Sequence, residues 1–91
     1  MNDLQLSNIA EDELIDKALR HKLSKAQRAE IRNAFDELKE DPYRGTPAVI
    51  APYVHEHFLG EGIYLVLYYA IEKHYANMTV RVSKVSIIMK M

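Results

Sequence analysis

Residues 63–89 read IYLVLYYAIEKHYANMTVRVSKVSIIM. Two runs rich in Tyr, Leu, Ile and Val are separated here by the short polar link KHYAN, residues 73–77. Aromatic and β-branched residues favour strands, and a link of this length joins antiparallel neighbours. The stretch therefore predicts a β-hairpin whose strands cover Ile63–Glu72 and Met78–Met89.

The second strand of this hairpin changes its alternation halfway along. Val80 and Val82 share one face of the strand, whereas Val85, Ile87 and Met89 have the opposite parity. A β-bulge at Ser83–Lys84 would place both sets on the core side of the sheet. Such a bulge turns four other residues outward, namely Arg81, Ser86, Ile88 and Lys90. Burial of both faces near the end of the strand is the alternative interpretation.

A third β-like run, Val49–Leu59, precedes the hairpin and has a break at Pro52. The short link LGEG, residues 59–62, makes it an antiparallel neighbour of the strand that begins at Ile63. In front of this run, residues 41–47 read DPYRGTP, which is typical of a turn because it holds two prolines and a glycine.

The first 41 residues have helical periodicity instead. Asp3–Ser7 alternates as a short edge strand would, and Ser7 or Asn8 is a suitable N-cap for a first helix. Ser24–Gln27 has the capping-box pattern and begins a second helix, which ends before Pro42. The expected apolar stripes of the two helices are Leu14, Ile15, Ala18 and Leu19, and Ile31, Ala34, Phe35 and Leu38.

The predicted element order is β-α-α-β-β-β within one α+β domain, residues 1–91. Only two or three residues near Lys22 separate the helices, and such a short link joins antiparallel helices. We therefore expect an N-terminal helical hairpin packed on one face of a small antiparallel sheet.

Composition limits the classes of function. The 91 residues are 48% apolar, contain no cysteine and carry a net charge of −1, so disulfides and thiolate metal sites are excluded. Nucleic-acid-binding domains are usually plainly basic, and this chain is not. The N-terminus lacks the pattern of a signal peptide, and the apolar run Ile63–Ile71 is too short to span a bilayer. We expect a soluble cytoplasmic protein.

Three motifs in this order resemble the RelE/ParE superfamily of bacterial toxins: FDELKEDPYRG (35–45), YLVLYYAIEK (64–73) and TVRVSKV (79–85). The resemblance covers nearly the whole chain and implies a RelE/ParE-like fold. It also implies the growth-inhibiting toxin of a type II toxin–antitoxin system, of the kind that stabilises plasmids. RelE-like members cut mRNA on the ribosome, ParE-like members poison DNA gyrase, and an antitoxin silences both.

Departures from the RelE-like pattern favour the ParE-like activity. Many family members read Val-Gly-His-Arg where this chain reads Val85-Ser86-Ile87-Ile88, and Leu65 stands where an arginine is often found. Partners implied by the resemblance are a cognate antitoxin and either the ribosome with mRNA or DNA gyrase. A homodimer is a further alternative, and no membrane partner is expected.

If the chain is an enzyme, the resemblance implies a metal-independent mRNA endoribonuclease. That chemistry needs a base, an acid and a cation for the phosphate. The candidate catalytic residues are His55, His57, Arg81 and Lys84. The candidate nucleic-acid-binding residues are Arg44, Arg81, Lys84 and Lys90. The alternative for all of them is an ordinary solvated side chain.

Residues 53–64, YVHEHFLGEGIY, place His55 and His57 on one face of a strand. If Val54 and Phe58 face the core, both rings face solvent. A zinc site would need a third ligand, for which His74 or Glu61 is the candidate. Two histidines are weak grounds for a metal, so we expect neither a metal nor a cofactor.

A non-enzymatic interaction module on the same scaffold is the alternative function, because fold alone does not determine function. The two functions predict different surfaces. A nuclease requires Arg81, Lys84 and a histidine to converge in one concavity. A binding module requires scattered charges and one exposed apolar patch.

Overall fold

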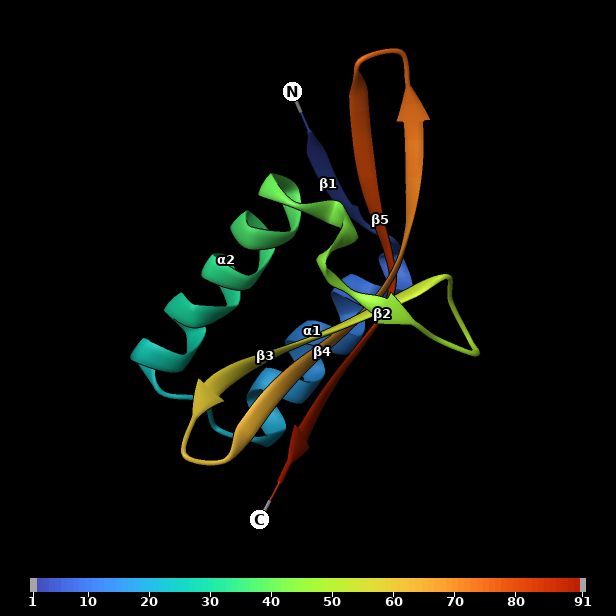
Figure 1. The fold of residues 1–91 in the computed structure, drawn as a ribbon. Coiled ribbons are helices and arrows are strands. Elements are labelled where there is room, and N and C mark those ends of the chain that lie inside the picture. The colour runs from blue at the N-terminus through green and yellow to red at the C-terminus, as the bar shows by residue number, and fades with distance from the viewer. Residues whose placement is uncertain (1, 91) are drawn as a thin grey trace.

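The computed structural model describes residues 2–90 of the chain as two helices and a five-stranded sheet (Figure 1). The helices cover one face of the sheet, and the residues buried between them form one hydrophobic core. In chain order, the elements are β1 (Asp3–Leu6), α1 (Asn8–Arg20), α2 (Lys25–Glu40), the short 3-10 helix η1 (Pro42–Arg44), β2 (Thr46–Pro47), β3 (Tyr53–Gly60), β4 (Ile63–His74) and β5 (Asn77–Met89).

The sheet is mixed, so the expected purely antiparallel sheet is wrong. Its strand order is β1-β5-β4-β3-β2, and β1 pairs in parallel with residues Thr79–Val82 of β5. The hairpins reverse the chain twice, so β5 runs in the direction of β3. β1 enters at the far edge of the sheet, where only β5 is free to pair with it.

The β4–β5 hairpin and its bulge confirm the prediction from the opening stretch. Tyr68 pairs with Lys84 and Tyr69 pairs with Val82, which leaves Ser83 as the extra residue. The bulge restores the inward direction, because both Val82 and Val85 are buried. Met89 is 62% exposed, so the expectation that it joins the core is wrong.

Both helix starts are as predicted. The Ser7 side chain accepts a hydrogen bond from the Ala10 amide, and Ser24 and Gln27 form the capping box. The helices diverge instead of packing closely together, since α1 lies on β5 and α2 lies across β3 and β1 (Figure 1). Two residues of the expected stripe of α1, Ile15 and Leu19, are exposed.

The run expected over Val49–Leu59 forms a strand only from Tyr53 onward. Residues 48–52 form an irregular loop, which follows β2. The preceding turn is fixed to the sheet by Tyr69, which is fully buried. Its hydroxyl donates to the Pro42 carbonyl at 2.7 Å and accepts from the Gly45 amide at 3.1 Å. A Cβ at Gly45 would overlap that hydroxyl, so the turn requires glycine there.

The sheet face opposite the helices has no helix over it, and we call it the open face. The residues of β3, β4 and β5 whose side chains point away from the core form it. Its apolar members are Val54, Phe58, Tyr64, Val66, Tyr68 and Ile88. The tip of the β4–β5 hairpin projects beyond the rest of the molecule (Figure 1).

Candidate functional site

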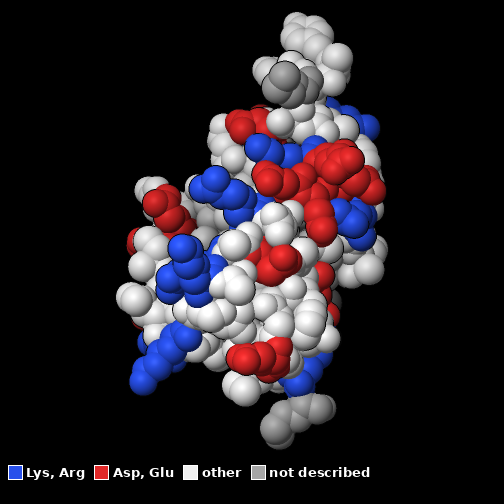
Figure 2. Space-filling model, turned by 90° about the vertical axis from the view of Figure 1, so that its left-hand side faces the viewer, with Lys and Arg blue, Asp and Glu red and all other residues white. Residues whose placement is uncertain are grey.

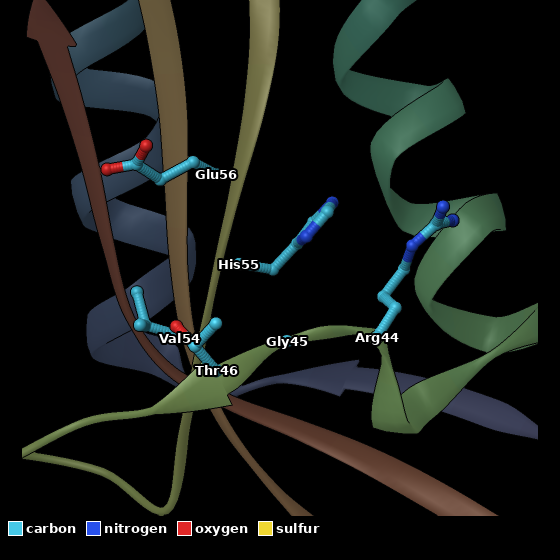
Figure 3. Close-up of a pocket in the computed structure, with 6 residues that line it drawn as sticks. All are labelled: Arg44, Gly45, Thr46, Val54, His55 and Glu56. Atoms are coloured by element: carbon cyan, nitrogen blue, oxygen red, sulfur yellow. The ribbon is translucent and has the colours of Figure 1, made fainter.

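The two histidines of β3 point toward α2, contrary to the expectation that they face solvent. Figure 3 shows the ring of His55 directed toward α2 and Glu56 directed to the other side of the strand. The cause is the position of Leu59, which is 4% exposed, whereas Phe58 is 52% exposed. Because alternate side chains of a strand point to the same face, His55 and His57 lie on the helix side together with Leu59.

His57 lies between two carboxylates of α2. Its Nε2 is 2.8 Å from an oxygen of Glu30, and its Nδ1 is 3.2 Å from an oxygen of Glu37. The side chain is only 12% exposed. The hydrogen bond with His57 lowers the pKa of Glu30, and a second bond from Asn33 acts in the same direction. His57 therefore connects β3 to two points of α2 that lie about two helical turns apart.

His55 has no comparable partner. Its Nε2 is shielded from solvent and makes no hydrogen bond within the part of the chain that the structure describes. Burial lowers the pKa of His55, and the positive charges of Arg44 and His57 lower it further. The ring is consequently biased toward the neutral form, which carries a free lone pair. An unpaired buried nitrogen is costly unless something else binds it.

A hollow of about 330 Å³ opens beside His55. The turn that Tyr69 fixes forms one side of it, and β3 forms the other (Figure 3). Arg44 borders this hollow and reaches Glu37, with 3.4 Å between the guanidinium and carboxylate atoms. The residues around the hollow are Arg44, Gly45, Thr46, Val54, His55 and Glu56.

Of the predicted cationic residues, Arg44 borders the hollow beside His55 and reaches Glu37, but Arg81, Lys84 and Lys90 pair with carboxylates elsewhere. Each forms an ion pair with a different carboxylate: Arg44 with Glu37, Arg81 with Glu72, Lys84 with Glu13, and Lys90 with Glu56. Arg81 also donates to the Gln5 side chain of β1, and Lys84 reaches across to α1. The single concavity that a nuclease requires is not formed by these residues.

Burial would raise the pKa of Glu13, but hydrogen bonds from Lys84 and from the Val85 amide outweigh it and hold the pKa below its ordinary value. Lys84 thus connects the bulged part of β5 to α1 through its ion pair with Glu13. On the face that carries α2, basic and acidic side chains lie interspersed, and acidic atoms form the larger continuous area (Figure 2). That face has no continuous basic surface for a phosphate backbone.

The open face carries the second hollow, of about 410 Å³. Three strands form its floor, and the loop after β2 overhangs it. Val49 and Ile50 of that loop are 104% and 64% exposed, although both are apolar. The residues around the hollow are Ala48, Val49, Ile50, Val54, Glu56, Val66, Tyr68, Ser86 and Ile88.

The sequence did not reveal the involvement of α2 in the histidine site. Glu37, His55 and His57 each offer one metal-binding atom, and these atoms lie within 4.8 Å of one another. Neither His74 nor Glu61 belongs to this group, so the third ligand considered from the sequence was wrong. The sequence did contain one signal for this site. Glu30 and Glu37 are seven residues apart, so both lie on the same face of the helix.

Comparisons with protein-family profiles, with curated proteins and with solved structures find no match to this chain. The described residues contain no helix with the length and apolar character needed to cross a membrane. What the fold and the site define is an α+β domain with a histidine–carboxylate cluster on one side of its sheet and an apolar surface on the other.

Proposed function

We propose that this chain acts by binding a protein through the open face, as a non-catalytic module on a scaffold like that of the RelE/ParE toxins. The observation that carries the proposal is the separation of charge from apolar surface. The predicted catalytic cations are dispersed in ion pairs, and the histidines lie on the opposite side of the sheet. Among residues 2–90, no helix covers the apolar hollow of the open face, and only the loop after β2 overhangs it.

The unpaired sheet edges support this proposal. β1 pairs with only Thr79–Val82 of β5, and β2 pairs with only Tyr53 and Val54 of β3. Beyond these pairs, no further strand lies along the outer edge of β5 or of β3 among residues 2–90, although the Val85 amide of β5 donates to Glu13. An edge next to an apolar face accepts an extended segment, whose backbone pairs with the edge while its side chains fill the hollow. An antitoxin-like segment with alternating apolar residues has this chemistry.

Within the toxin family, the gyrase-directed activity agrees better with this surface than mRNA cleavage does. Poisoning a protein target needs a binding surface, whereas cleaving RNA needs a base, an acid and a cation that act on one phosphate. The resemblance of the three motifs supports the toxin–antitoxin setting, and the open face supports the binding mode.

Growth of bacteria that express the chain inducibly tests this proposal. The wild-type chain is expected to arrest growth while transcripts stay intact. Ile88→Glu, which places a charge in the hollow of the open face, is expected to abolish the arrest. Ile15→Glu on the exposed side of α1 is the matched control and should still arrest growth.

A double variant separates binding from catalysis. Arg81→Ala combined with Lys84→Ala is expected to keep the arrest, because these cations have structural partners and no catalytic role in this proposal. Cleaved transcripts with the wild-type chain, together with loss of arrest in the double variant, would contradict it. Failure of the wild-type chain to affect growth would remove the toxin setting.

A further inference from the structure

His57 is in a position that one proton cannot satisfy. A neutral imidazole has one N–H and one lone pair, yet both of its ring nitrogens face carboxylate oxygens, of Glu30 and Glu37. If Nε2 donates to Glu30, the Nδ1 lone pair points at the negative Glu37 oxygen. Either a second proton or another cation must lie between Nδ1 and Glu37.

His55 provides a second, independent observation. Its Nε2 is shielded from solvent and has no hydrogen-bond partner among the described residues. One metal-binding atom of His55 lies within 4.8 Å of those of His57 and Glu37. A second proton on His57 would explain the contact with Glu37 but would leave His55 without a partner. A metal ion would bind His57, Glu37 and His55 at once and so would explain both observations.

The spacing of the donor atoms fits a tetrahedral ion. Two ligand atoms at about 2.0–2.1 Å from zinc, with a tetrahedral angle between them, lie about 3.3 Å apart. The observed separation of His57 Nδ1 and the Glu37 oxygen is 3.2 Å. The ligand atom of His55 lies within 4.8 Å of the other two. A small movement of α2 or of these side chains can bring all three atoms to the spacing of a tetrahedral site.

The surroundings match those of known metal sites. A metal-bound histidine almost always donates its other N–H to a carboxylate or carbonyl, and Glu30 accepts from Nε2 of His57 at 2.8 Å. Two histidines and one glutamate form a ligand set of zinc enzymes, in which water takes the fourth position. The hollow borders His55, one of the three proposed ligands.

We propose that His55, His57 and Glu37 form a binding site for a divalent transition-metal ion, with Zn²⁺ the ion that this ligand set suits best. The ion connects α2 to β3 and replaces the Arg44 guanidinium as the partner of Glu37. This site does not depend on the proposed protein-binding function, because its ligands lie on the other side of the sheet.

Titration of the metal-stripped full-length chain with Zn²⁺ tests the proposal, followed by calorimetry and by the unfolding temperature. We expect one ion per chain and an unfolding temperature that rises with zinc concentration. Co²⁺ in place of Zn²⁺ should give the visible absorption of a tetrahedral site. Absence of binding would overturn the proposal.

His55→Leu is the most informative variant, because it removes a ligand without breaking a hydrogen bond. It is expected to fold at least as stably as the wild-type protein and to lose 1:1 zinc binding. His74→Ala changes an exposed histidine at the end of β4 and should bind zinc as the wild type does. Unchanged binding in His55→Leu, or equal loss in His74→Ala, would overturn the site.

Three further variants keep the test decisive if His55→Leu does not fold. Glu37→Gln should also abolish binding, whereas Glu30→Gln should weaken it by about 10–100-fold, as changes to the outer partners of metal ligands do. Arg44→Ala should bind zinc several-fold more tightly, because it removes the cation that competes for Glu37. Weaker binding in Arg44→Ala would contradict the proposed geometry.

Discussion

The two sides of the sheet differ in what they do with polar groups. On the helix side, His55, His57 and Tyr69 lie among apolar residues, and each is positioned by elements distant in sequence. On the open face, charged residues pair with one another in solvent, and the apolar residues lie under no helix and are only partly covered by the loop after β2. Adjacent residues of β3 therefore belong to two different surfaces, one suited to a metal ion and one suited to a protein.

The largest expected difference in stability is between two truncations to alanine. One removes an apolar side chain on the helix side, and the other removes a side chain of equal size on the open face. Leu67→Ala removes a fully buried side chain from the core and should lower the free energy of unfolding by about 2–5 kcal/mol. Ile88→Ala on the open face should lower it less, by about 1 kcal/mol, because that side chain is only partly buried.

Urea denaturation of both variants measures this difference. If Ile88→Ala destabilises the chain as much as Leu67→Ala does, the open face belongs to the core of the isolated protein. It would then be unsuited to a partner.

A smaller effect is expected from removing hydroxyl groups at neighbouring tyrosines. Tyr69→Phe leaves the Pro42 carbonyl and the Gly45 amide without their partner, which should cost about 1–3 kcal/mol. Tyr68→Phe on the open face should be nearly neutral. Thermal unfolding compares the two, and equal melting temperatures would show that the turn does not depend on Tyr69.

A smaller effect on stability, which comes from the Glu13 carboxylate, should depend on pH. The pKa of Glu13 is lowered in the folded chain from its ordinary value of 4.5, so its contribution is present above that value and is lost as the pH falls through the folded pKa. Glu13→Gln should therefore cost about 1 kcal/mol at neutral pH, and progressively less as the pH falls through the folded pKa of Glu13. Urea denaturation of both proteins at neutral and at acidic pH measures this difference.

Glu56→Gln, which changes an exposed pair with Lys90, should have no measurable effect at either pH. A cost of Glu13→Gln that stays constant with pH would show that the charge of Glu13 is not what stabilises the bulge.

The sequence predicted the parts of the fold that local rules determine. Ser7 and Ser24 begin helices because their side chains satisfy free amides, and the parity change after Val82 located the bulge at Ser83. These signals lie within a few residues of the feature that they predict. The RelE/ParE-like arrangement stays a proposal that rests on the motifs.

The candidate site was less predictable because β3 is ambiguous. Apolar residues occur at both parities of this strand, so Phe58 and Leu59 competed for the core and the wrong residue was chosen. The choice depends on the packing of α2 and on the irregular pairing between Phe58 and Gly60. Glu37 is far from the histidines in sequence, and only the folded chain shows that it is their neighbour.

The most direct test of the difference between the two sides is a zinc titration followed by proton–carbon spectra of the folded chain. The account predicts that the ring signals of His55 and His57 move together and saturate at one ion per chain. The methyl signals of Val66 and Ile88 on the open face should stay unchanged. Histidine signals that do not respond to zinc, or methyl shifts on the open face of the same size, would contradict it.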